Sequence, residues 1–286
     1  MNYIFLRFPG GKPKAVTFSY DDGCRSDIRF VETIDKYGIK CTFNINSEMF
    51  GADENSSRLT ADEVEKYLAS SHHEIAVHGA FHKAEGSIRP IMGIRDVLDC
   101  RRGLEKRFDR IITGMAYPDS GITVFRNGAD YETIKRYLKD LGISYARTLG
   151  GDNASFELPA DWYAWMPTAH HNNPNVMNYI TKFCNIKYDN VYVANRAPRL
   201  FYLWGHSYEF KNNNNWELLD NICEALGGKD DTWYATNMEI YEYVEAYKSL
   251  VFSADDSICY NPTLKDIWFD IGEKLVMIKS GETIRL

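Results

Sequence analysis

Titratable side chains follow three apolar runs of the sequence. The stretch AVTFSYDDGC ends in two adjacent acids, Asp21 and Asp22, and EIAVHGAFH places His78 and His82 four residues apart. A third run, FYLWGH, ends at His206. Two imidazoles and one carboxylate suit a divalent transition metal and leave positions open for water and substrate. A second carboxylate beside such a set could take a proton from water.

Each of these features also has a structural explanation. Asp and Gly both favour turns, so Asp-Asp-Gly could simply end a strand. An isolated pair of histidines at this spacing is more often made of surface or core residues. The metal hypothesis gains weight because the acid pair and the histidine pair both come directly after a predicted buried strand. We therefore expect them to share one site.

The rest of the chain predicts how these residues are positioned. Apolar runs predict strands at 15–18, 39–45, 74–77, 111–117, 143–147, 163–167 and 200–204, and helical spacing predicts helices at 25–37, 60–69, 90–108, 129–141, 216–226 and 237–250. Strands that alternate with helices indicate βαβ units and a mainly parallel sheet. About seven units in this length favour an α/β barrel over an open sheet. In such folds, chemistry collects at the C-terminal ends of the strands.

The pattern of apolar and turn-forming residues changes near residue 250. We expect residues 1–250 to form the barrel and residues 251–286 to form a small β-rich extension without catalytic groups, since short strand patterns there alternate with turn signals. A lone hairpin is only marginally stable, so the extension should cover the barrel with its apolar side chains. These are Val251, Phe252, Trp268, Phe269, Leu275 and Val276.

Bulk properties exclude some classes of function. The net charge of −7 argues against nucleic acid or an anionic membrane as a partner. No apolar run approaches the roughly 20 residues of a membrane span, and the start of the sequence lacks a signal-peptide pattern, so we expect a cytoplasmic protein. The six cysteines are scattered, which favours neither a zinc knuckle nor a disulfide framework. The many aromatic residues could line a carbohydrate site or pack in the core.

Five short motifs together resemble one enzyme family. SYDDG, HGAFH, AYPDSG, ADW and LWGH occur in this order over residues 15–206 and are similar to the motifs of the polysaccharide deacetylases, the family 4 carbohydrate esterases. The resemblance implies a distorted (β/α) barrel and metal-dependent removal of N- or O-acetyl groups from sugars. It implies Asp21 as the catalytic base and Asp22, His78 and His82 as ligands of one divalent ion. Zinc is the expected ion, with cobalt, nickel or iron as alternatives.

The resemblance also implies roles for further residues. His206 would be the general acid toward the leaving group, and Asp161 and Trp162 would help to orient the active-site groups. The backbone N–H of Asp119 would support the oxyanion. Contacts with a carbohydrate, or with a small acetylated or amide substrate, are expected from Tyr117, Pro118, Asp119, Trp162, Trp165 and Trp204, although each tryptophan could instead pack in the barrel. Asn44 and Asn46, after the second strand, could contact substrate or cap loops, and His170 or His171 could reach the site.

One departure from the family pattern leaves the activity open. The family has an arginine two residues before the proline of the third motif, bonded to the catalytic base, whereas this sequence has Ala116. A nearby cation would lower the pKa of Asp21, so this loss leaves the tuning of the base in question. The alternatives are a hydrolase of cyclic or linear C–N bonds and a glycan-binding module with weakened catalysis. A two-His-one-carboxylate iron oxygenase shares the ligand set, but the strand–helix alternation and Asp21 weigh against it.

Overall fold

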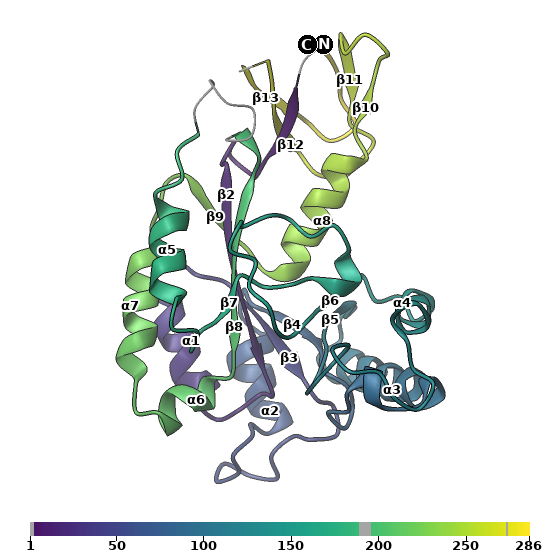
Figure 1. Cartoon of the computed structure of the whole chain (residues 1–286), viewed down its shortest axis with the longest axis vertical. Helices are drawn as coiled ribbons and strands as arrows, with labels where there is room; N and C mark the ends of the chain where they lie inside the picture. Colours follow the sequence, from purple (N-terminus) through teal and green to yellow (C-terminus); the bar gives the residue numbers. More distant parts are fainter. Residues whose placement is uncertain (1–2, 189–195, 273) are drawn as a thin grey trace.

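A curled parallel sheet forms the centre of the molecule (Figure 1). The computed structural model describes residues 3–188, 196–272 and 274–286. The sheet has the order β6-β5-β4-β3-β2-β8-β7, and β9 (Thr232–Tyr234) pairs with the first half of β2. The strands of this order are β2 (Lys14–Asp21), β3 (Cys41–Ile45), β4 (Glu74–Val77), β5 (Gly114–Ala116), β6 (Tyr145–Arg147), β7 (Ala169–His170) and β8 (Arg199–Gly205).

The two edges of the sheet approach each other. A parallel bridge joins Arg147, the last residue of β6, to Trp165, in the segment that leads to β7. The N–H of Thr148 donates to the Trp165 carbonyl at 3.0 Å, and the N–H of Trp165 donates to the Ala146 carbonyl at 3.1 Å. These contacts bend the parallel sheet toward closure. The prediction of a distorted (β/α) barrel with about seven strands is confirmed.

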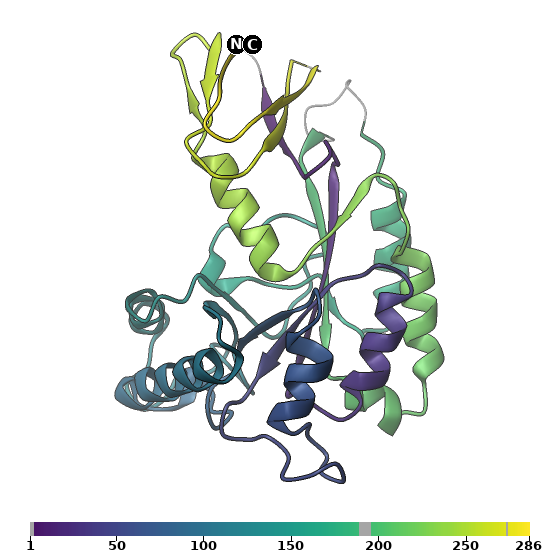
Figure 2. The ribbon, with the colours of Figure 1, turned by 180° about the vertical axis from the view of Figure 1, so that it is seen from behind.

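Helices surround the sheet, and the extension lies beyond α8 at one end (Figures 1 and 2). Thr60 and Glu63 form the predicted capping box at the start of α2, and the helix continues as a π-helical stretch to Ala69. No helix in the described part of the chain is both long and apolar enough to cross a membrane. The helices are α1 (Asp27–Asp35), α2 (Ala61–Val64), α3 (Pro90–Phe108), α4 (Tyr131–Asp140), α5 (Val176–Cys184), α6 (Ser207–Asn212), α7 (Trp216–Leu226) and α8 (Asn237–Lys248).

The structure differs from the sequence prediction between residues 160 and 190. The predicted strand at 163–167 is wrong, because residues 162–164 form a 3₁₀ turn and β7 begins only at Ala169. The carboxylate of Asp161 accepts the N–H of Tyr163 and so starts this turn. Helix α5 was not predicted, because the Asn-Asn-Pro-Asn run before it has the composition of a loop.

The β-rich extension contains strands from both ends of the chain. β1 (Ile4–Arg7) pairs with β12 (Ile267–Ile271), which also pairs with β13 (Lys274–Ile278). A second antiparallel sheet consists of β10 (Val251–Phe252), β11 (Ile258–Tyr260) and β14 (Thr283–Arg285). Ile267 and Phe269 are fully buried in one apolar cluster with Ile240 and Val244 of α8. The extension and α8 therefore share a core.

The register of the sheet places the site residues in one layer. Asp21, at the end of β2, pairs with Asn44 of β3. Ala116, at the end of β5, pairs with Arg147 at the end of β6. His206 follows directly after β8, the other long neighbour of β2. Because all of these strands are parallel, their C-terminal ends meet at one edge of the barrel.

Candidate active site

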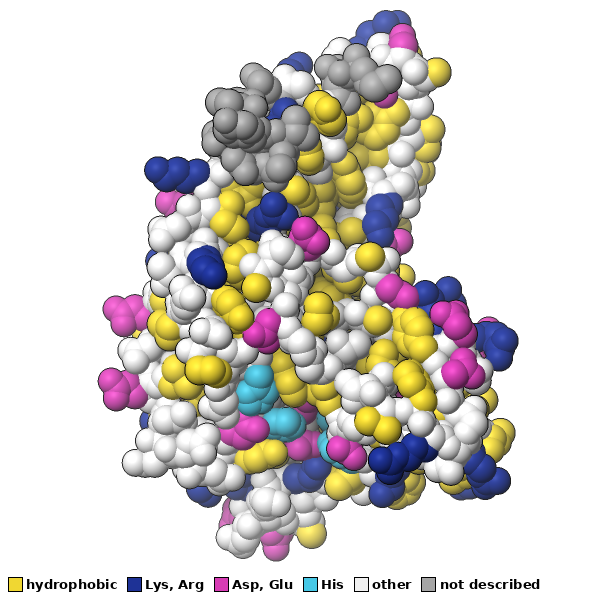
Figure 3. Space-filling model, in the orientation of Figure 1, with side chains coloured by type: hydrophobic (Ala, Val, Ile, Leu, Met, Phe, Trp, Pro, Cys, Tyr) yellow, Lys and Arg dark blue, Asp and Glu magenta, His cyan; other side chains and the backbone are white. Residues whose placement is uncertain are grey.

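One acid and two histidines converge at the ends of β2 and β4. The Nε2 atom of His82 lies 3.5 Å from Oδ1 of Asp22, and the Nε2 atom of His78 lies 4.0 Å from the same oxygen. Asp22 and His82 have left-handed backbone conformations, with φ of 82° and 55°. Such conformations cost of order 1–3 kcal/mol each and persist where the surroundings enforce them. Histidines gather beside acidic side chains on this face of the molecule (Figure 3).

The hydrogen bonds of His78 fit a metal ligand. Its Nδ1 lies 2.9 Å from the carbonyl oxygen of Ala116, which can only accept, so Nδ1 carries the proton. The Nε2 atom then has a free lone pair, and it is buried with no hydrogen-bond partner among the described residues. Burial lowers the pKa of His78 to about 4, so the imidazole is neutral near pH 7. A neutral histidine held by a carbonyl at its second nitrogen is the usual arrangement of a metal ligand.

In two other clusters of histidine and acid, the histidine does not present a free lone pair to the acid. The Nδ1 atom of His170 accepts the N–H of Asn172 at 3.1 Å, so its Nε2 carries the proton and donates to Glu209 at 3.1 Å. In the same way, Nδ1 of His73 accepts a backbone N–H, and its Nε2 lies 3.1 Å from Asp35. In both cases the imidazole nitrogen that faces the acid is a donor. The tautomers of His73 and His170 therefore suit a metal ligand less well than that of His78.

Neighbouring side chains hold the cluster in place. A guanidinium nitrogen of Arg58 donates to Oδ1 of Asp22 at 2.9 Å, and another donates to Oδ1 of Asn46 at 2.7 Å. The amide of Asn46 donates in turn to the carbonyls of His78 and Gly79. Asn46 therefore supports the backbone of the metal-site loop, in line with the loop-capping alternative from the sequence. Gly79 has φ of 70°, which favours glycine, since other residues rarely adopt it.

Asp21 lies beside this cluster in a buried network. Its side chain is 1% exposed, its Oδ2 lies 2.6 Å from a guanidinium nitrogen of Arg147, and its Oδ1 accepts from Asn44 at 2.8 Å. Burial alone would raise the pKa of Asp21, but Arg147, His78, His206 and the bond from Asn44 outweigh burial and hold the pKa below its usual value. Asp21 is therefore ionised near pH 7 and able to accept a proton.

Arg147 supplies the cation that the sequence lacks at Ala116. The two residues pair in register on neighbouring strands, so the guanidinium comes from β6 instead of β5. The guanidinium also lies over the ring of Trp204, with its central carbon 4.5 Å from the ring centre. The ring of His170 packs against Trp204 with centres 4.6 Å apart. The predicted site residue Trp204 thus lies between Arg147 and His170.

His206 faces both Asp21 and a second carboxylate. Its Nε2 lies 3.9 Å from Oδ2 of Asp21, and its Nδ1 lies 3.3 Å from Oε1 of Glu209. Burial alone would lower the pKa of His206, but Glu209 and the charges of Asp21 and Asp22 outweigh burial and raise the pKa above its usual value. The cationic form of His206 is therefore favoured. Glu209 also lies 3.0 Å from Nε2 of His171, so one carboxylate holds several imidazoles.

The contacts of Asp161 and Trp162 lie away from this layer. The carboxylate of Asp161 accepts from the hydroxyl of Tyr131 at 2.7 Å and from Lys135 at 2.5 Å. The indole N–H of Trp162 donates to Glu245 of α8 at 2.6 Å. The carboxylates that lie near His206 are those of Asp21 and Glu209. The expected orienting role of Asp161 stays a prediction, and its carboxylate contacts the side chains of Tyr131 and Lys135.

Trp165 is a core residue and not an exposed substrate contact. Its side chain is 1% exposed, and it packs against Tyr145, Trp162 and Tyr202 with ring centres 4.9–5.3 Å apart. Trp165 therefore packs in the core, as the alternative from the sequence allowed, because its indole has no exposed face.

The third motif forms a turn at the end of β5. Tyr117 and Pro118 are buried, and the hydroxyl of Tyr117 donates to the carbonyl of Tyr163 at 2.9 Å. Asp119 is exposed, has φ of 50°, and its N–H donates to no other described residue. The N–H of Asp119 is therefore free to bind a ligand oxygen. The side chains of Tyr117 and Pro118 build the turn that presents it.

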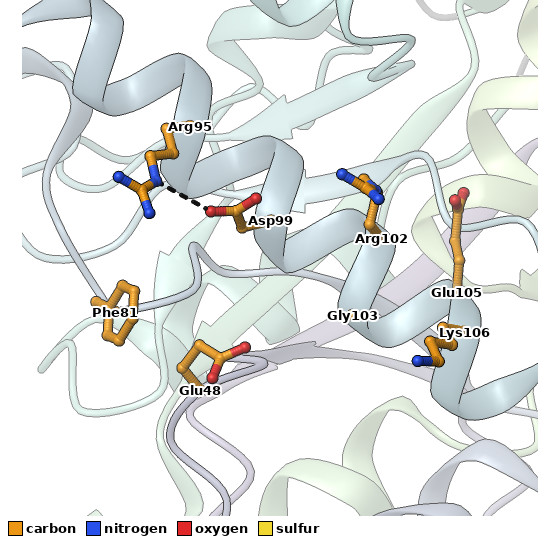
Figure 4. A pocket seen from close by; sticks show the side chains of 8 residues that line it. All are labelled: Glu48, Phe81, Arg95, Asp99, Arg102, Gly103, Glu105 and Lys106. Carbon is orange, nitrogen blue, oxygen red and sulfur yellow. Dashed lines mark hydrogen bonds and ion pairs between the residues drawn. The ribbon is translucent and has the colours of Figure 1, made fainter.

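Two cavities are lined by a candidate metal ligand or by a residue next to one in sequence. One, of about 560 Å³, includes Asp22 and Tyr208 in its lining. The other, of about 620 Å³, lies between Phe81 and α3 (Figure 4). Phe81 precedes His82 and is 54% exposed. Asp22 lines the first cavity, whereas none of the three candidate metal ligands lines the second.

Three residues of the site were missed in the sequence. Arg147 ends a predicted strand, and the rule that chemistry collects at strand ends could have identified it. Glu209 lies three residues after His206, a spacing that brings side chains together on a helical turn. Arg58 lies in a loop 36 residues after its partner Asp22, and no local pattern indicates that contact.

Comparisons with known proteins concern the family and the fold of the chain. Residues 9–146 match the family model described as polysaccharide deacetylase, which confirms the family resemblance over the part of the chain that holds the first three motifs. No curated protein matches the chain in sequence.

Several solved structures share the fold. A protein from Mycobacterium smegmatis, described as a polysaccharide deacetylase, is 16% identical with a TM-score of 0.56, over 85% of this chain and 94% of that one. The PuuE allantoinase is 12% identical with a TM-score of 0.57, over 82% and 91%. The family 4 carbohydrate esterase domain of a xylanase from the hindgut metagenome of Trinervitermes trinervoides is 15% identical with a TM-score of 0.50, over 82% and 92%. At these identities the likeness establishes the fold.

Proposed function

We propose that this chain, whose residues 9–146 match the polysaccharide deacetylase family, is a metal-dependent hydrolase that removes acetyl groups from an N- or O-acetylated sugar. The observation that carries the proposal is the free, buried lone pair of His78 Nε2 next to Asp22 and His82, with the ionised Asp21 beside it. A ligand set and a separate base are the two parts that metal-assisted hydrolysis needs.

Asp22, His78 and His82 would hold one divalent ion, with zinc the first candidate for this nitrogen–oxygen set. Such an ion, when bound, acts as a Lewis acid that polarises an acyl oxygen and lowers the pKa of water. The supporting contacts favour this assignment, since Ala116 fixes the tautomer of His78 and Arg58 fixes the carboxylate of Asp22. Cobalt, nickel or iron would also suit the set.

The remaining residues divide the proton transfers between them. Asp21 would take a proton from the attacking water as the new carbon–oxygen bond forms, with Arg147 and Asn44 holding the carboxylate. The N–H of Asp119 would stabilise the oxyanion. His206 would then give its proton to the departing nitrogen or oxygen as the bond to the acyl carbon breaks. Water adds to the acyl group, and acetate and the free amine or hydroxyl leave.

Arg147 bears directly on the binding-module alternative. That alternative rested on the loss of the arginine beside the base, but a guanidinium lies 2.6 Å from Asp21. The alternative of a cyclic or linear amide hydrolase is kept as the second candidate, because the allantoinase shares the fold and the same base, acid and oxyanion donor could act on a C–N bond.

Metal analysis combined with product assays tests the proposal. The purified chain should hold one equivalent of a divalent metal and release acetate from N-acetylated chitooligosaccharides or from O-acetylated xylan. A cyclic amide such as a hydantoin, followed by ring opening, tests the second candidate. Metal-loaded protein that releases acetate from neither sugar would contradict the deacetylase proposal, and ring opening alone would replace it with amide hydrolysis.

A further inference from the structure

The cavity beside Asp22 carries more positive than negative charge. Its charged lining residues are Asp22, Arg25, Arg58 and Lys211, and the rest of its lining consists of Tyr208, Cys24 and serine and asparagine residues. The cavity lies between the turn after β2, the loop that contains Arg58, and helix α6. In a chain with a net charge of −7, such a surplus of cations is a local reversal of sign.

The cavity beside Phe81 gives a matched comparison within the same molecule. Its lining contains three basic residues and three acidic ones, so the charges balance (Figure 4). They are Arg95, Arg102, Lys106, Glu48, Asp99 and Glu105. Of these two cavities, only the one that Asp22 lines has an excess of cations.

The partners of each cation show which charges remain available. Arg25 makes two contacts with Glu63, at 2.6 and 2.9 Å, so its charge is balanced. Arg58 contacts Asp22, whose own charge would also be shared with a bound divalent ion. Lys211 is exposed, and its ammonium pairs with no acid among the described residues. A ligand in this cavity therefore meets an uncompensated ammonium beside a cationic centre.

We propose that this cavity binds an anionic group, a carboxylate first, on the sugar next to the acetylated one, so that the preferred substrate is an acidic glycan. Lys211 would face that group, and the half-exposed ring of Tyr208, 5.2 Å from His206, would pack against the sugar ring. The inference rests on the proposed function for the sugar and its acyl group. The prediction that the bound group is negatively charged follows from the lining residues of the cavity alone.

Equilibrium binding tests the proposal without turnover. An Asp21→Asn background slows hydrolysis, and calorimetry at low ionic strength compares two oligosaccharides of equal length. One is a neutral N-acetylated chitooligosaccharide, and the other alternates N-acetylglucosamine with glucuronate. We expect tighter binding of the acidic one, and Lys211→Glu should weaken that binding by roughly 3- to 10-fold while neutral binding is unchanged. Added salt should reduce the difference.

Lys106→Glu, in the balanced cavity beside α3, is the matched control and should change neither affinity. A disaccharide in which the sugar next to N-acetylglucosamine carries a phosphate instead of a carboxylate separates the two anions, and a Lys211-dependent preference for either anion supports the proposal. Equal affinity of the protein for the acidic and the neutral oligosaccharide would overturn the proposal. So would an equal loss of affinity for the acidic oligosaccharide in Lys211→Glu and Lys106→Glu. Acetate release tests the proposed function separately, since a neutral substrate can be deacetylated efficiently while the charge preference is absent.

Discussion

The guanidinium of Arg147 lies 2.6 Å from the carboxylate of Asp21, and both side chains are almost completely buried. Arg147 belongs to β6 and pairs in register with Ala116 of β5, the position at which the family resemblance led us to expect an arginine. The charge thus reaches the carboxylate from the neighbouring strand. The contact links the tuning of Asp21 to the pairing of two short strands.

Arg147→Met should leave the charge of Asp21 buried without a partner. We expect the free energy of unfolding to fall by about 3–5 kcal/mol and turnover to fall about 10²-fold, because the carboxylate loses its fixed position. Urea denaturation and steady-state kinetics measure the two effects. Arg147→Met combined with Asp21→Asn should be more stable than Arg147→Met alone, since the uncompensated charge is gone. Additive losses in the double variant would show that the pair is not coupled.

Variants of the two adjacent acids should fail in different ways. Asp22→Asn and His82→Ala should lose bound metal, and excess metal should restore part of the activity of Asp22→Asn. Asp21→Asn should keep its metal and lose roughly 10²–10⁴-fold in turnover, which is the usual contribution of a positioned base. Metal analysis of the purified variants measures the first effect. His170→Ala is the control and should keep a full equivalent, because the tautomer of His170 presents a donor to Glu209.

The pH dependence of turnover should depend on Glu209. Glu209 and the charges of Asp21 and Asp22 raise the pKa of His206, and His206 must be protonated to act as an acid, so activity is lost as the pH rises through this pKa. Glu209→Gln removes a negative charge, which lowers the pKa and moves the alkaline limb of the kcat profile to lower pH. NMR titration of His206 provides a second readout. Glu217→Gln, on the exposed face of α7, should leave the profile unchanged.

The division into a barrel over residues 1–250 and a β extension over residues 251–286 predicts a structural role for the extension. A chain that ends at Leu250 loses the partner of β1 and exposes the core that the extension shares with α8. Removal of Ile267, Phe269, Ile271 and Ile278, all buried, should lower the free energy of unfolding by more than about 5 kcal/mol. Urea denaturation measures the loss. Removal of residues 283–286 alone should have a small effect, because β14 is mostly exposed.

The sequence by itself determined the class of the fold and the main residues of the candidate site. The spacing of apolar residues and the local composition define local structure. The buried strands, the capping box at Thr60 and the long helix over residues 90–108 could therefore be predicted. Asp22, His78 and His82 could be grouped because each follows a strand of a parallel sheet, and the C-terminal ends of such strands lie together.

Only the tertiary structure decided which residues support that site. Arg147 contacts Asp21 across 126 residues of sequence, and β1 joins a strand more than 250 residues away, because strand pairing and register depend on the whole sheet. The contact of Asp161 with Lys135 depends on the turn that Asp161 begins, which its sequence neighbours do not indicate. The proposal of His78 as a metal ligand required the position of the Ala116 carbonyl, since the acceptor at Nδ1 decides which nitrogen is free.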